Sequence, residues 1–165
     1  MSSTLPPRLA GLRLLCLDVD GVLTDGNLYW SGPGVFSQRF SVKDGVGIRL
    51  VEQSGVVVAI LSAGDVPSGR DRARSLGIEH AFFGLADKVA AFHDLLGKLK
   101  LEPRQAAFMG DELSDLPLLR EAGVSFTVPD APDEVRAAVD YVTKRRGGDG
   151  AVREVTDLVR AAKGG

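Results

Sequence analysis

Residues 12–26 read LRLLCLDVDGVLTDG, an apolar run that is followed at once by two carboxylates two positions apart. Residues i and i+2 of an extended strand point to the same side. If residues 12–17 form a buried strand, Asp18 and Asp20 leave its C-terminal end facing one pocket, and Gly21 lets the backbone turn away. Carboxylates this close repel each other unless a cation lies between them. Because oxygen ligands alone favour Mg²⁺, the motif predicts a magnesium site.

The composition is typical of a soluble globular protein. With 165 residues, 44% of them hydrophobic, the chain is expected to form one domain over residues 1–165, with its core at about 12–160. The net charge is −2 with both signs interspersed, so no nucleic-acid or membrane partner is expected. No signal peptide and no run near the ~20 apolar residues of a membrane span is visible, which predicts a cytoplasmic location. The single cysteine, Cys16, is expected to be a small buried side chain.

Strand patterns and helix patterns alternate along the chain. Strands are expected at 12–18, 56–62, 81–83, 105–109, 124–128 and 140–142. Helices are expected at 44–54, 66–76, 86–99, 112–122, 132–138 and 151–162. Strands separated by helices form right-handed βαβ units, so the sequence predicts an α/β fold with a Rossmann-like, doubly wound and mainly parallel sheet. The ends, residues 1–10 and 163–165, are expected to be loose.

Residues 27–40 interrupt this alternation. Two apolar segments, 28–30 and 35–36, flank the turn sequence Ser31-Gly-Pro-Gly34, a pattern that predicts a β-hairpin protruding from the sheet. A hairpin that carries Tyr29, Trp30 and Phe36 would expose a large apolar area if it stood alone in water. It is therefore expected either to contact another subunit or to fold as a flap onto its own.

Polar side chains also follow the other predicted strands. In an open parallel sheet, active sites form beyond the carboxyl ends of the strands. Strand 56–62 ends in Ser62-Ala-Gly64, strand 105–109 is followed by Asp111 and Asp115, and Lys88 begins a helix. Each of these also has an ordinary explanation, such as a turn hydroxyl, a surface charge or a helix cap. Their joint position at one edge of the sheet favours a common site.

A calcium loop is an alternative for the first motif, because Asp-x-Asp also begins an EF-hand. That loop needs an acid or amide at position 22, glycine at 23 and glutamate at 29. Val22, Leu23 and Tyr29 occupy these positions. The calcium-loop alternative is therefore excluded.

The order of these motifs resembles that of the haloacid dehalogenase superfamily of phosphatases. The motifs are Asp18-x-Asp20-Gly-Val-x-Thr-Asp, then Ser62, Lys88 and Gly110-Asp111-x-x-x-Asp115. Residues 40–49 (FSVKDGVGIR), 87–88 (DK), 141–143 (YVT) and 147–154 (GGDGAVRE) are similar to the capless branch typified by 3-deoxy-D-manno-octulosonate 8-phosphate phosphatase. The resemblance covers about residues 12–160 and implies that the fold has no cap domain.

The resemblance implies a Mg²⁺-dependent phosphomonoester hydrolase that works through an aspartyl-phosphate. Asp18 would attack phosphorus, and Asp20 would protonate the leaving alcohol and then activate water. Mg²⁺ would be held by Asp18, the backbone carbonyl of Asp20 and Asp111.

Ser62 and Lys88 would bind the transferring phosphoryl oxygens, and Asp115 would orient Lys88 or a metal-bound water. These residues complete the expected catalytic set.

The expected substrate is a small phosphorylated sugar acid, such as 3-deoxy-D-manno-octulosonate 8-phosphate or a nonulosonate 9-phosphate. The family usually has Thr-Gly-Arg where this chain has Ser62-Ala-Gly64, so the guanidinium that would grip the substrate carboxylate is missing. Arg70 is a candidate substitute. The resemblance also places substrate contacts at Lys43, Asp44, Gly45, Arg49 and Arg72.

In this branch the resemblance implies a homotetramer in which hairpins associate and a neighbour's C-terminal segment closes the site. The segment Gly147-Gly-Asp-Gly150 is either a flexible closing loop or an ordinary connection to the last helix.

Two other classes of function are considered. The first is a non-catalytic or regulatory oligomerisation module, related to a domain of nucleotide-sugar synthetases. The retained Asp18, Asp20, Lys88 and Asp111 argue against it. The second is a phospho-acceptor receiver domain, but receivers take phosphate on a middle strand, whereas the acid pair here follows the first strand.

Overall fold

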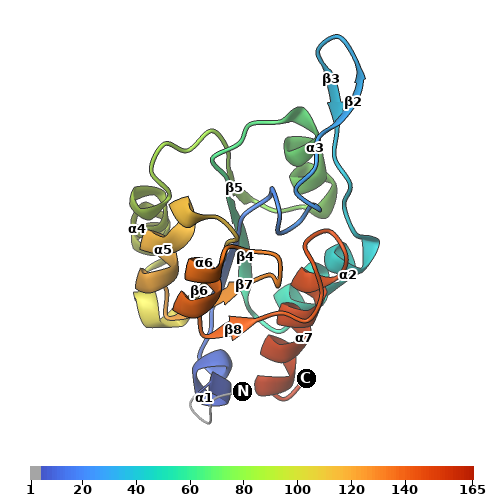
Figure 1. The fold of residues 1–165 in the computed structure, drawn as a ribbon. Helices are drawn as coiled ribbons and strands as arrows, with labels where there is room; N and C mark the ends of the chain where they lie inside the picture. The colour runs from blue at the N-terminus through green and yellow to red at the C-terminus, as the bar shows by residue number, and fades with distance from the viewer. Residues whose placement is uncertain (1–4) are drawn as a thin grey trace.

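The computed structural model describes residues 5–165. Its centre is a six-stranded sheet in which every paired neighbour is parallel, in the order β5-β4-β1-β6-β7-β8 (Figure 1). The strands are β1 (Leu14–Leu17), β4 (Val57–Leu61), β5 (His80–Phe82), β6 (Ala106–Met109), β7 (Val124–Thr127) and β8 (Tyr141–Val142). The predicted Rossmann-like parallel sheet is confirmed.

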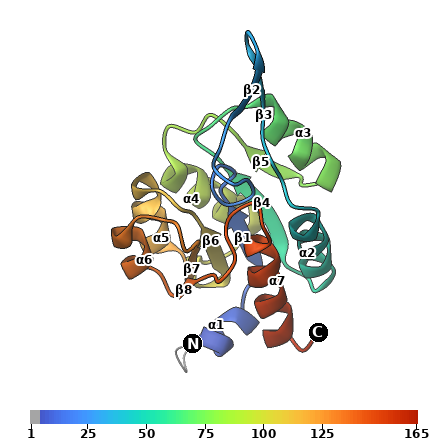
Figure 2. The same ribbon diagram turned by 45° about the vertical axis from the view of Figure 1, so that its right-hand side comes forward.

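Helices cover both faces of this sheet. Figure 2 shows α4 (Lys88–Leu99), α5 (Leu116–Glu121) and α6 (Asp133–Ala138) on one side, with α2 (Val42–Gln53), α3 (Pro67–Leu76) and α7 (Ala151–Ala162) on the other. β1 and β6 lie in the middle of the sheet and all their residues are buried, as expected for parallel strands covered on both faces. The expected helix at 112–122 is divided into a 3₁₀ turn, Leu113–Asp115, and α5.

The predicted hairpin is present and projects from the end of the sheet (Figure 1). It consists of β2 (Tyr29–Gly32) and β3 (Val35–Ser37), which pair antiparallel. Its large apolar side chains are exposed, namely Leu28, Tyr29, Trp30, Val35 and Phe36. Trp30 alone is 67% exposed, so the hairpin does not form a flap over its own subunit in this structure.

The expectation of loose ends is wrong for the residues that the structure describes. Residues 5–10 form α1 (Leu5–Ala10), in which Leu5 and Leu9 are buried. Arg8 anchors this helix by donating to both carboxylate oxygens of Asp140, at 2.6 and 2.9 Å. At the other end, the Nζ of Lys163 donates to the carbonyl of Leu12 at 2.9 Å. The two ends are therefore attached to each other; residues 1–4 lie outside the described part.

No helix within residues 5–165 is long and apolar enough to cross a membrane. The cytoplasmic location stays a prediction. Cys16 is fully buried in β1, and this burial raises the pKa of its thiol, in agreement with the expected role as a small core side chain.

Candidate active site

A cavity of ≈ 270 Å³ opens at the carboxyl edge of the sheet. Leu17, the last residue of β1, pairs with Ile60 of β4 and Met109 of β6, so the chain leaves three neighbouring strands at one level. The lining residues are Asp18, Asp20, Gly21, Gly26, Ala63, Gly64, Lys88, Asp111, Glu112 and Ser114. The structure therefore brings together four of the predicted catalytic and metal-binding residues, from segments far apart in the sequence: Asp18, Asp20, Lys88 and Asp111.

Lys88 connects two carboxylates in this site. Its Nζ donates to Oδ2 of Asp18 and to Oδ1 of Asp115, each at 2.7 Å. The three side chains are at most 9% exposed. Burial acts to lower the pKa of Lys88, but the two carboxylates outweigh it, so the pKa lies above its usual value and the ammonium stays charged. Asp87 caps α4 by accepting from the Ala90 N–H at 3.0 Å, which fixes the helix start beneath Lys88.

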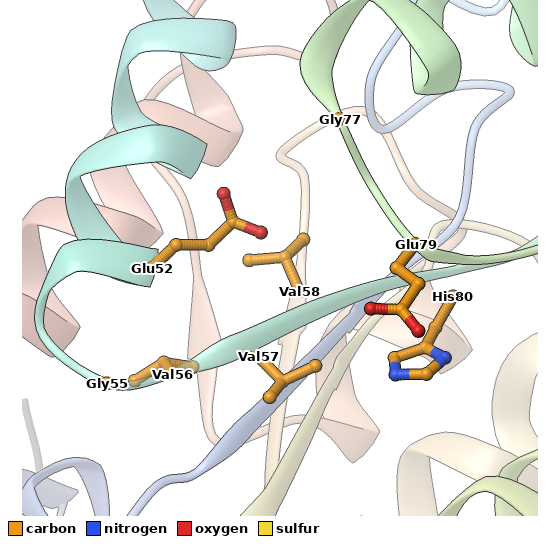
Figure 3. A pocket seen from close by; sticks show the side chains of 8 residues that line it. All are labelled: Glu52, Gly55, Val56, Val57, Val58, Gly77, Glu79 and His80. Atoms are coloured by element: carbon orange, nitrogen blue, oxygen red, sulfur yellow. The ribbon is translucent and has the colours of Figure 1, made fainter.

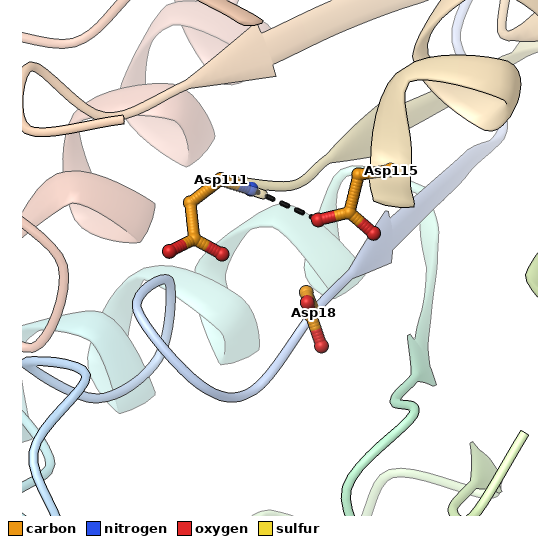
Figure 4. A group of neighbouring side chains, drawn as sticks. All are labelled: Asp18, Asp111 and Asp115. Carbon is orange, nitrogen blue, oxygen red and sulfur yellow. Dashed lines mark hydrogen bonds between the residues drawn. The ribbon is translucent and has the colours of Figure 1, made fainter. Parts of the chain in front are cut away.

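Asp115 also organises the loop that follows β6. Its Oδ2 accepts the backbone N–H of Asp111 at 3.1 Å (Figure 4). The same oxygen accepts the backbone N–H of Glu112, also at 3.1 Å. A β-carbon on Gly110 would lie 2.6 Å from the same oxygen, so the loop needs glycine there to pass so close. With both oxygens occupied, Asp115 holds Lys88 on one side and Asp111 on the other.

Asp18, Asp111 and Asp115 form a group that could hold a metal ion (Figure 4). One carboxylate oxygen of each lies within 4.8 Å of the others. Burial, with the neighbouring carboxylates adding to it, raises the pKa of Asp111 to about 8. Burial also raises the pKa of Asp18 to about 6, although Lys88 acts against it.

The space around Asp111 fits a bound cation. A β-carbon on Gly21 would lie 1.9 Å from Oδ2 of Asp111, and Gly21 has a φ of +74°, so only glycine lets this carboxylate reach across the loop toward Asp18. No side chain or N–H of residues 5–165 donates a hydrogen bond to the Asp111 carboxylate. The Asp111 carboxylate, without a donor of its own, and the neighbouring Asp18 carboxylate, which accepts from Val19 and Lys88, are oxygen ligands of the kind that suits Mg²⁺.

Asp20 has different partners from Asp18. Its Oδ1 accepts from Nε2 of Gln38 at 2.5 Å, and Oε1 of Gln38 accepts from the Ser68 hydroxyl at 2.7 Å. Neither Gln38 nor Ser68 was predicted from the sequence. Gln38 directly follows β3, and a polar residue there gives no signal of its own, because its partner is eighteen residues away in the chain.

Ser62 is buried at the end of β4, with 1% of its surface exposed. Its backbone pairs on both sides, since its N–H donates to Phe82 and its carbonyl accepts from Leu85, each at 3.0 Å. The side chain lines a narrow space beside Asp20 and Gly64, next to the acidic cavity.

None of the five predicted substrate residues lines the acidic cavity. Asp44 is 1% exposed, and its Oδ1 accepts the Arg153 N–H at the start of α7 at 2.7 Å. Its Oδ2 has no hydrogen-bond partner among residues 5–165, and burial raises its pKa to about 6. Asp44 thus joins α2 to α7 in this structure.

The other four lie on α2 and α3. Arg72 donates to the carbonyl of Ser41 at 3.1 Å, and Gly45 lies against its guanidinium. Arg49 donates to the carbonyl of Ser75 at 3.4 Å. Lys43 lines a separate cavity of ≈ 200 Å³ near the start of α7. Their contact with a substrate stays a prediction.

Arg70, the candidate substitute for the missing arginine, is paired with another residue. It donates to both oxygens of Asp65, at 2.5 and 2.9 Å, and its guanidinium lies over the Phe83 ring.

The glycine segment at 147–150 packs against the loop that carries the acid pair. The N–H of Gly148 donates to the carbonyl of Val22 at 3.2 Å. A β-carbon on Gly147 would lie 1.8 Å from the Gly21 carbonyl oxygen, and one on Gly148 would lie 2.5 Å from the Asp25 nitrogen. This segment therefore supports the site of its own chain, and the closing of a neighbour's site stays a prediction.

A second cavity, of ≈ 350 Å³, lies at the opposite edge of the sheet (Figure 3). Glu52, Glu79 and the buried His80 line it, together with Gly55, Val56, Val57, Val58 and Gly77. Within residues 5–165 the acids and imidazole of this cavity do not come close enough to form a metal-binding group. The nucleophile candidates lie at the other end of the strands.

Known proteins share this fold and these motifs. Residues 83–155 match the haloacid dehalogenase-like hydrolase family. The chain is 43% identical over 156 residues to the 3-deoxy-D-manno-octulosonate 8-phosphate phosphatase of Yersinia pestis. The aligned residues are 94% of this chain and 83% of that protein.

Solved structures agree. The phosphatase of the same name from Moraxella catarrhalis, in complex with magnesium ion, phosphate ion and KDO, has a TM-score of 0.96 at 36% identity, over 99% of this chain and 94% of that chain. The cobalt-bound deoxy-D-mannose-octulosonate 8-phosphate phosphatase of Haemophilus influenzae has a TM-score of 0.91 at 40% identity, over 95% of this chain and 92% of that chain.

The chain therefore belongs to the haloacid dehalogenase-like hydrolases. Residues 5–165 contain the parallel sheet and the hairpin but no inserted cap domain. Within this family it is a phosphatase, of the capless branch that resembles the 3-deoxy-D-manno-octulosonate 8-phosphate phosphatases.

Proposed function

We propose that this phosphatase is Mg²⁺-dependent and hydrolyses a small phosphorylated sugar acid through an aspartyl-phosphate on Asp18. The observation that carries the proposal is the position of Asp18, at the end of β1, between the Lys88 ammonium and the free carboxylate of Asp111. Asp18 is held by one fixed cation and faces a donor set for a second. An anionic nucleophile needs this arrangement to approach an anionic ester.

The chemistry has two steps. First, an Asp18 oxygen attacks phosphorus, the bond from phosphorus to the substrate oxygen breaks, and Asp20 gives its proton to the leaving alcohol. Second, Asp20 takes a proton from a water molecule that attacks the aspartyl-phosphate. Phosphate leaves, and Asp18 and the protonated Asp20 are restored.

The surrounding residues hold the transferring group. Lys88 and Ser62 bind phosphoryl oxygens, and Asp115 orients Lys88 through the 2.7 Å contact between them. Asp18, the backbone carbonyl of Asp20 and Asp111 would hold Mg²⁺. When bound, the ion supplies positive charge that offsets the repulsion between carboxylate and phosphate.

The magnitude of the task shows why the charges matter. Hydrolysis of phosphate monoesters is accelerated by enzymes up to ~10²¹-fold, whereas a positioned acid or base contributes about 10²–10⁴. Most of the remaining acceleration must come from fixed charges and positioning. Lys88, buried and held by two carboxylates, is the fixed positive charge that this chain itself supplies.

The substrate proposal is supported by the relatives. The Yersinia pestis protein is named for 3-deoxy-D-manno-octulosonate 8-phosphate, and the Moraxella catarrhalis structure holds phosphate and the sugar acid. We include a nonulosonate 9-phosphate as an alternative, because Gly64 leaves this chain without an arginine at that position. Lys43, Asp44, Gly45, Arg49 and Arg72 are carried as proposed substrate contacts.

We propose that the protein assembles as a homotetramer. Each chain is proposed to form one domain. The apolar hairpin side chains, exposed at the tip of the molecule, support an association through hairpins.

Phosphate release from a panel of sugar phosphates tests the proposal. The wild type is expected to release phosphate with Mg²⁺ and to lose at least ~10³-fold of its rate with a chelator or as Asp18→Asn. Glu79→Gln, which removes a carboxylate from the opposite cavity, is the control and should keep the full rate. No release from any substrate would favour the regulatory oligomerisation module instead.

A further inference from the structure

Asp20 is held by a residue of the hairpin stem rather than by the Lys88 network. Gln38 is the first residue after β3, and its Nε2 donates to Oδ1 of Asp20 at 2.5 Å. The stem is fixed next to this contact, because Thr24 and Phe40 form a backbone bridge and Thr24 is completely buried. The contact therefore connects a firmly placed segment to the carboxyl group of Asp20.

The contact with Asp20 determines the orientation of the Gln38 amide. The NH₂ group is the only donor of this side chain, so it must face the Asp20 oxygen that accepts the bond. The Oε1 group then points to α3, where it accepts from the Ser68 hydroxyl at 2.7 Å. Both ends of the amide are satisfied in this orientation, and flipping it would lose the bond to Asp20, because Oε1 cannot donate.

The second oxygen of Asp20 lies over Gly64. A β-carbon built on Gly64 would be 2.6 Å from Oδ2 of Asp20, closer than any side chain tolerates. Both residues line the acidic cavity. The glycine that replaces the family arginine thus provides the space in which Oδ2 lies.

We propose that Gln38 is a positioning residue for the acid/base step, acting through Asp20 without touching the substrate. By occupying Oδ1, its N–H leaves Oδ2 as the oxygen that carries the proton, and Gly64 gives that oxygen room beside the cavity. This inference rests on the acid/base role proposed for Asp20.

The proton moves without breaking the Gln38 contact. In the first step it passes from Oδ2 to the substrate oxygen as that oxygen separates from phosphorus. In the second step Oδ2 takes a proton from the attacking water. Oδ1 accepts from Gln38 throughout, so the carboxyl group does not have to rotate between the two steps.

A comparison of leaving groups tests this role. p-Nitrophenol leaves without protonation, whereas a sugar alcohol needs a proton from the acid. Gln38→Met keeps the length of the side chain and removes the donor, with Gln53→Met, on the exposed end of α2, as its matched control. The kcat/KM of both variants with p-nitrophenyl phosphate and with the sugar phosphate that wild type hydrolyses fastest compares the first step alone, and kcat is recorded beside it.

Gln38→Met is expected to lose about 10²-fold in kcat/KM on the sugar phosphate and less than about 3-fold on p-nitrophenyl phosphate, since kcat/KM covers only the steps up to release of the alcohol. Its kcat should fall on both substrates, because the second step uses Asp20 as the base whichever alcohol has left. Gly64→Ala, which displaces Oδ2 instead of Oδ1, should show the same selective loss. Gln53→Met should match wild type. Equal losses of kcat/KM on the two substrates, or no loss of kcat/KM on the sugar phosphate, would overturn the positioning role.

Asp20→Asn separates this inference from the proposed function. If Asp20→Asn selectively loses kcat/KM on the sugar phosphate and Gln38→Met does not, the role of Gln38 is wrong while the role of Asp20 stands. If Asp20→Asn itself shows no selective loss, the acid/base assignment fails and the inference fails with it.

Discussion

The ammonium of Lys88 lies 2.7 Å from Oδ2 of Asp18 and joins the first turn of α4 to the end of β1. Both side chains are 9% exposed, so solvent screens this ion pair only weakly. The same ammonium contacts the fully buried Asp115. The positive charge of Lys88 therefore offsets the repulsion between the carboxylates of Asp18 and Asp115.

Replacing Lys88 should affect both stability and catalysis. Lys88→Met leaves two buried carboxylates without their cation, so we expect the free energy of unfolding to fall by about 3 kcal/mol in the absence of metal. We also expect kcat to fall about 10²–10³-fold, because a fixed charge on the phosphoryl group is lost. Urea unfolding and phosphate-release kinetics measure the two effects. Lys98→Met, exposed on the same helix, is the control; if Lys88→Met behaved like it, the assigned role would be wrong.

Gly147 should be essential for the position of the acid pair. Gly147→Ala would bring a β-carbon to 1.8 Å from the Gly21 carbonyl oxygen, which is backbone and cannot move without moving the loop. We expect a loss of about 1–3 kcal/mol in stability and more than about 10-fold in kcat. Gly97→Ala is the matched control, since nothing lies within 4 Å of its β-carbon position in α4. Wild-type kinetics in Gly147→Ala would contradict the close packing of the two segments.

Asp44 should make stability depend on pH. Its pKa is about 6 in the native protein against an ordinary 3.8, so the native state holds a proton that the unfolded state releases. The free energy of unfolding should therefore decrease as the pH rises from about 4 to about 6 and then level off. Asp44→Asn keeps an oxygen for the Arg153 N–H and removes the titration. As the pH rises from 4 to 7, the free energy of unfolding of Asp44→Asn should increase by about 2 kcal/mol relative to that of wild type.

Chemical unfolding at several pH values measures this difference. Asp71→Asn, on the exposed face of α3, serves as the control and should follow wild type at every pH. A constant difference between Asp44→Asn and wild type would show that Asp44 does not titrate in this range.

The hairpin should carry the assembly. Trp30 and Phe36 face each other across β2 and β3 and are 67% and 49% exposed, so their replacement by serine should cost the isolated chain little. By light scattering after size exclusion, wild type is expected at four times the 17.5 kDa of one chain and Trp30→Ser/Phe36→Ser at a lower mass. Val42→Ser, 78% exposed outside the hairpin, should leave the mass unchanged. A monomeric wild type, or a tetrameric double variant, would exclude this interface.

The sequence was a good guide to the sheet and to the acid cluster. Strand β1 and the acids that follow it are local features of the sequence. Strand patterns alternate with helix patterns along the chain, which predicts a parallel sheet whose other strands end at the same edge. Lys88 was found in the same way, because it begins a helix directly after a strand and turn. Its contact with Asp115 was implied by the family resemblance, whereas its contact with Asp18 was not predicted.

Other features depend on contacts that sequence patterns do not encode. Helix α1 is too short to show a period and is fixed by Arg8 and by its packing with the end of the chain. The contact of Gln38 with Asp20 requires the hairpin stem to return past the acid pair. The substrate contact of Asp44 stays a prediction from its motif, and the motif gives no signal of the bond by which Asp44 caps a distant helix.

The central claim is that Asp18 carries the phosphoryl group, and trapping that group tests it most directly. Asp20→Asn keeps the nucleophile and removes the base for the second step, while p-nitrophenyl phosphate needs no acid in the first. The aspartyl-phosphate should therefore accumulate in this variant with Mg²⁺. Borohydride reduces an acyl phosphate to homoserine, which peptide mass spectrometry can locate. The account predicts homoserine at residue 18; homoserine at another residue, or none during a burst of p-nitrophenol, would contradict it.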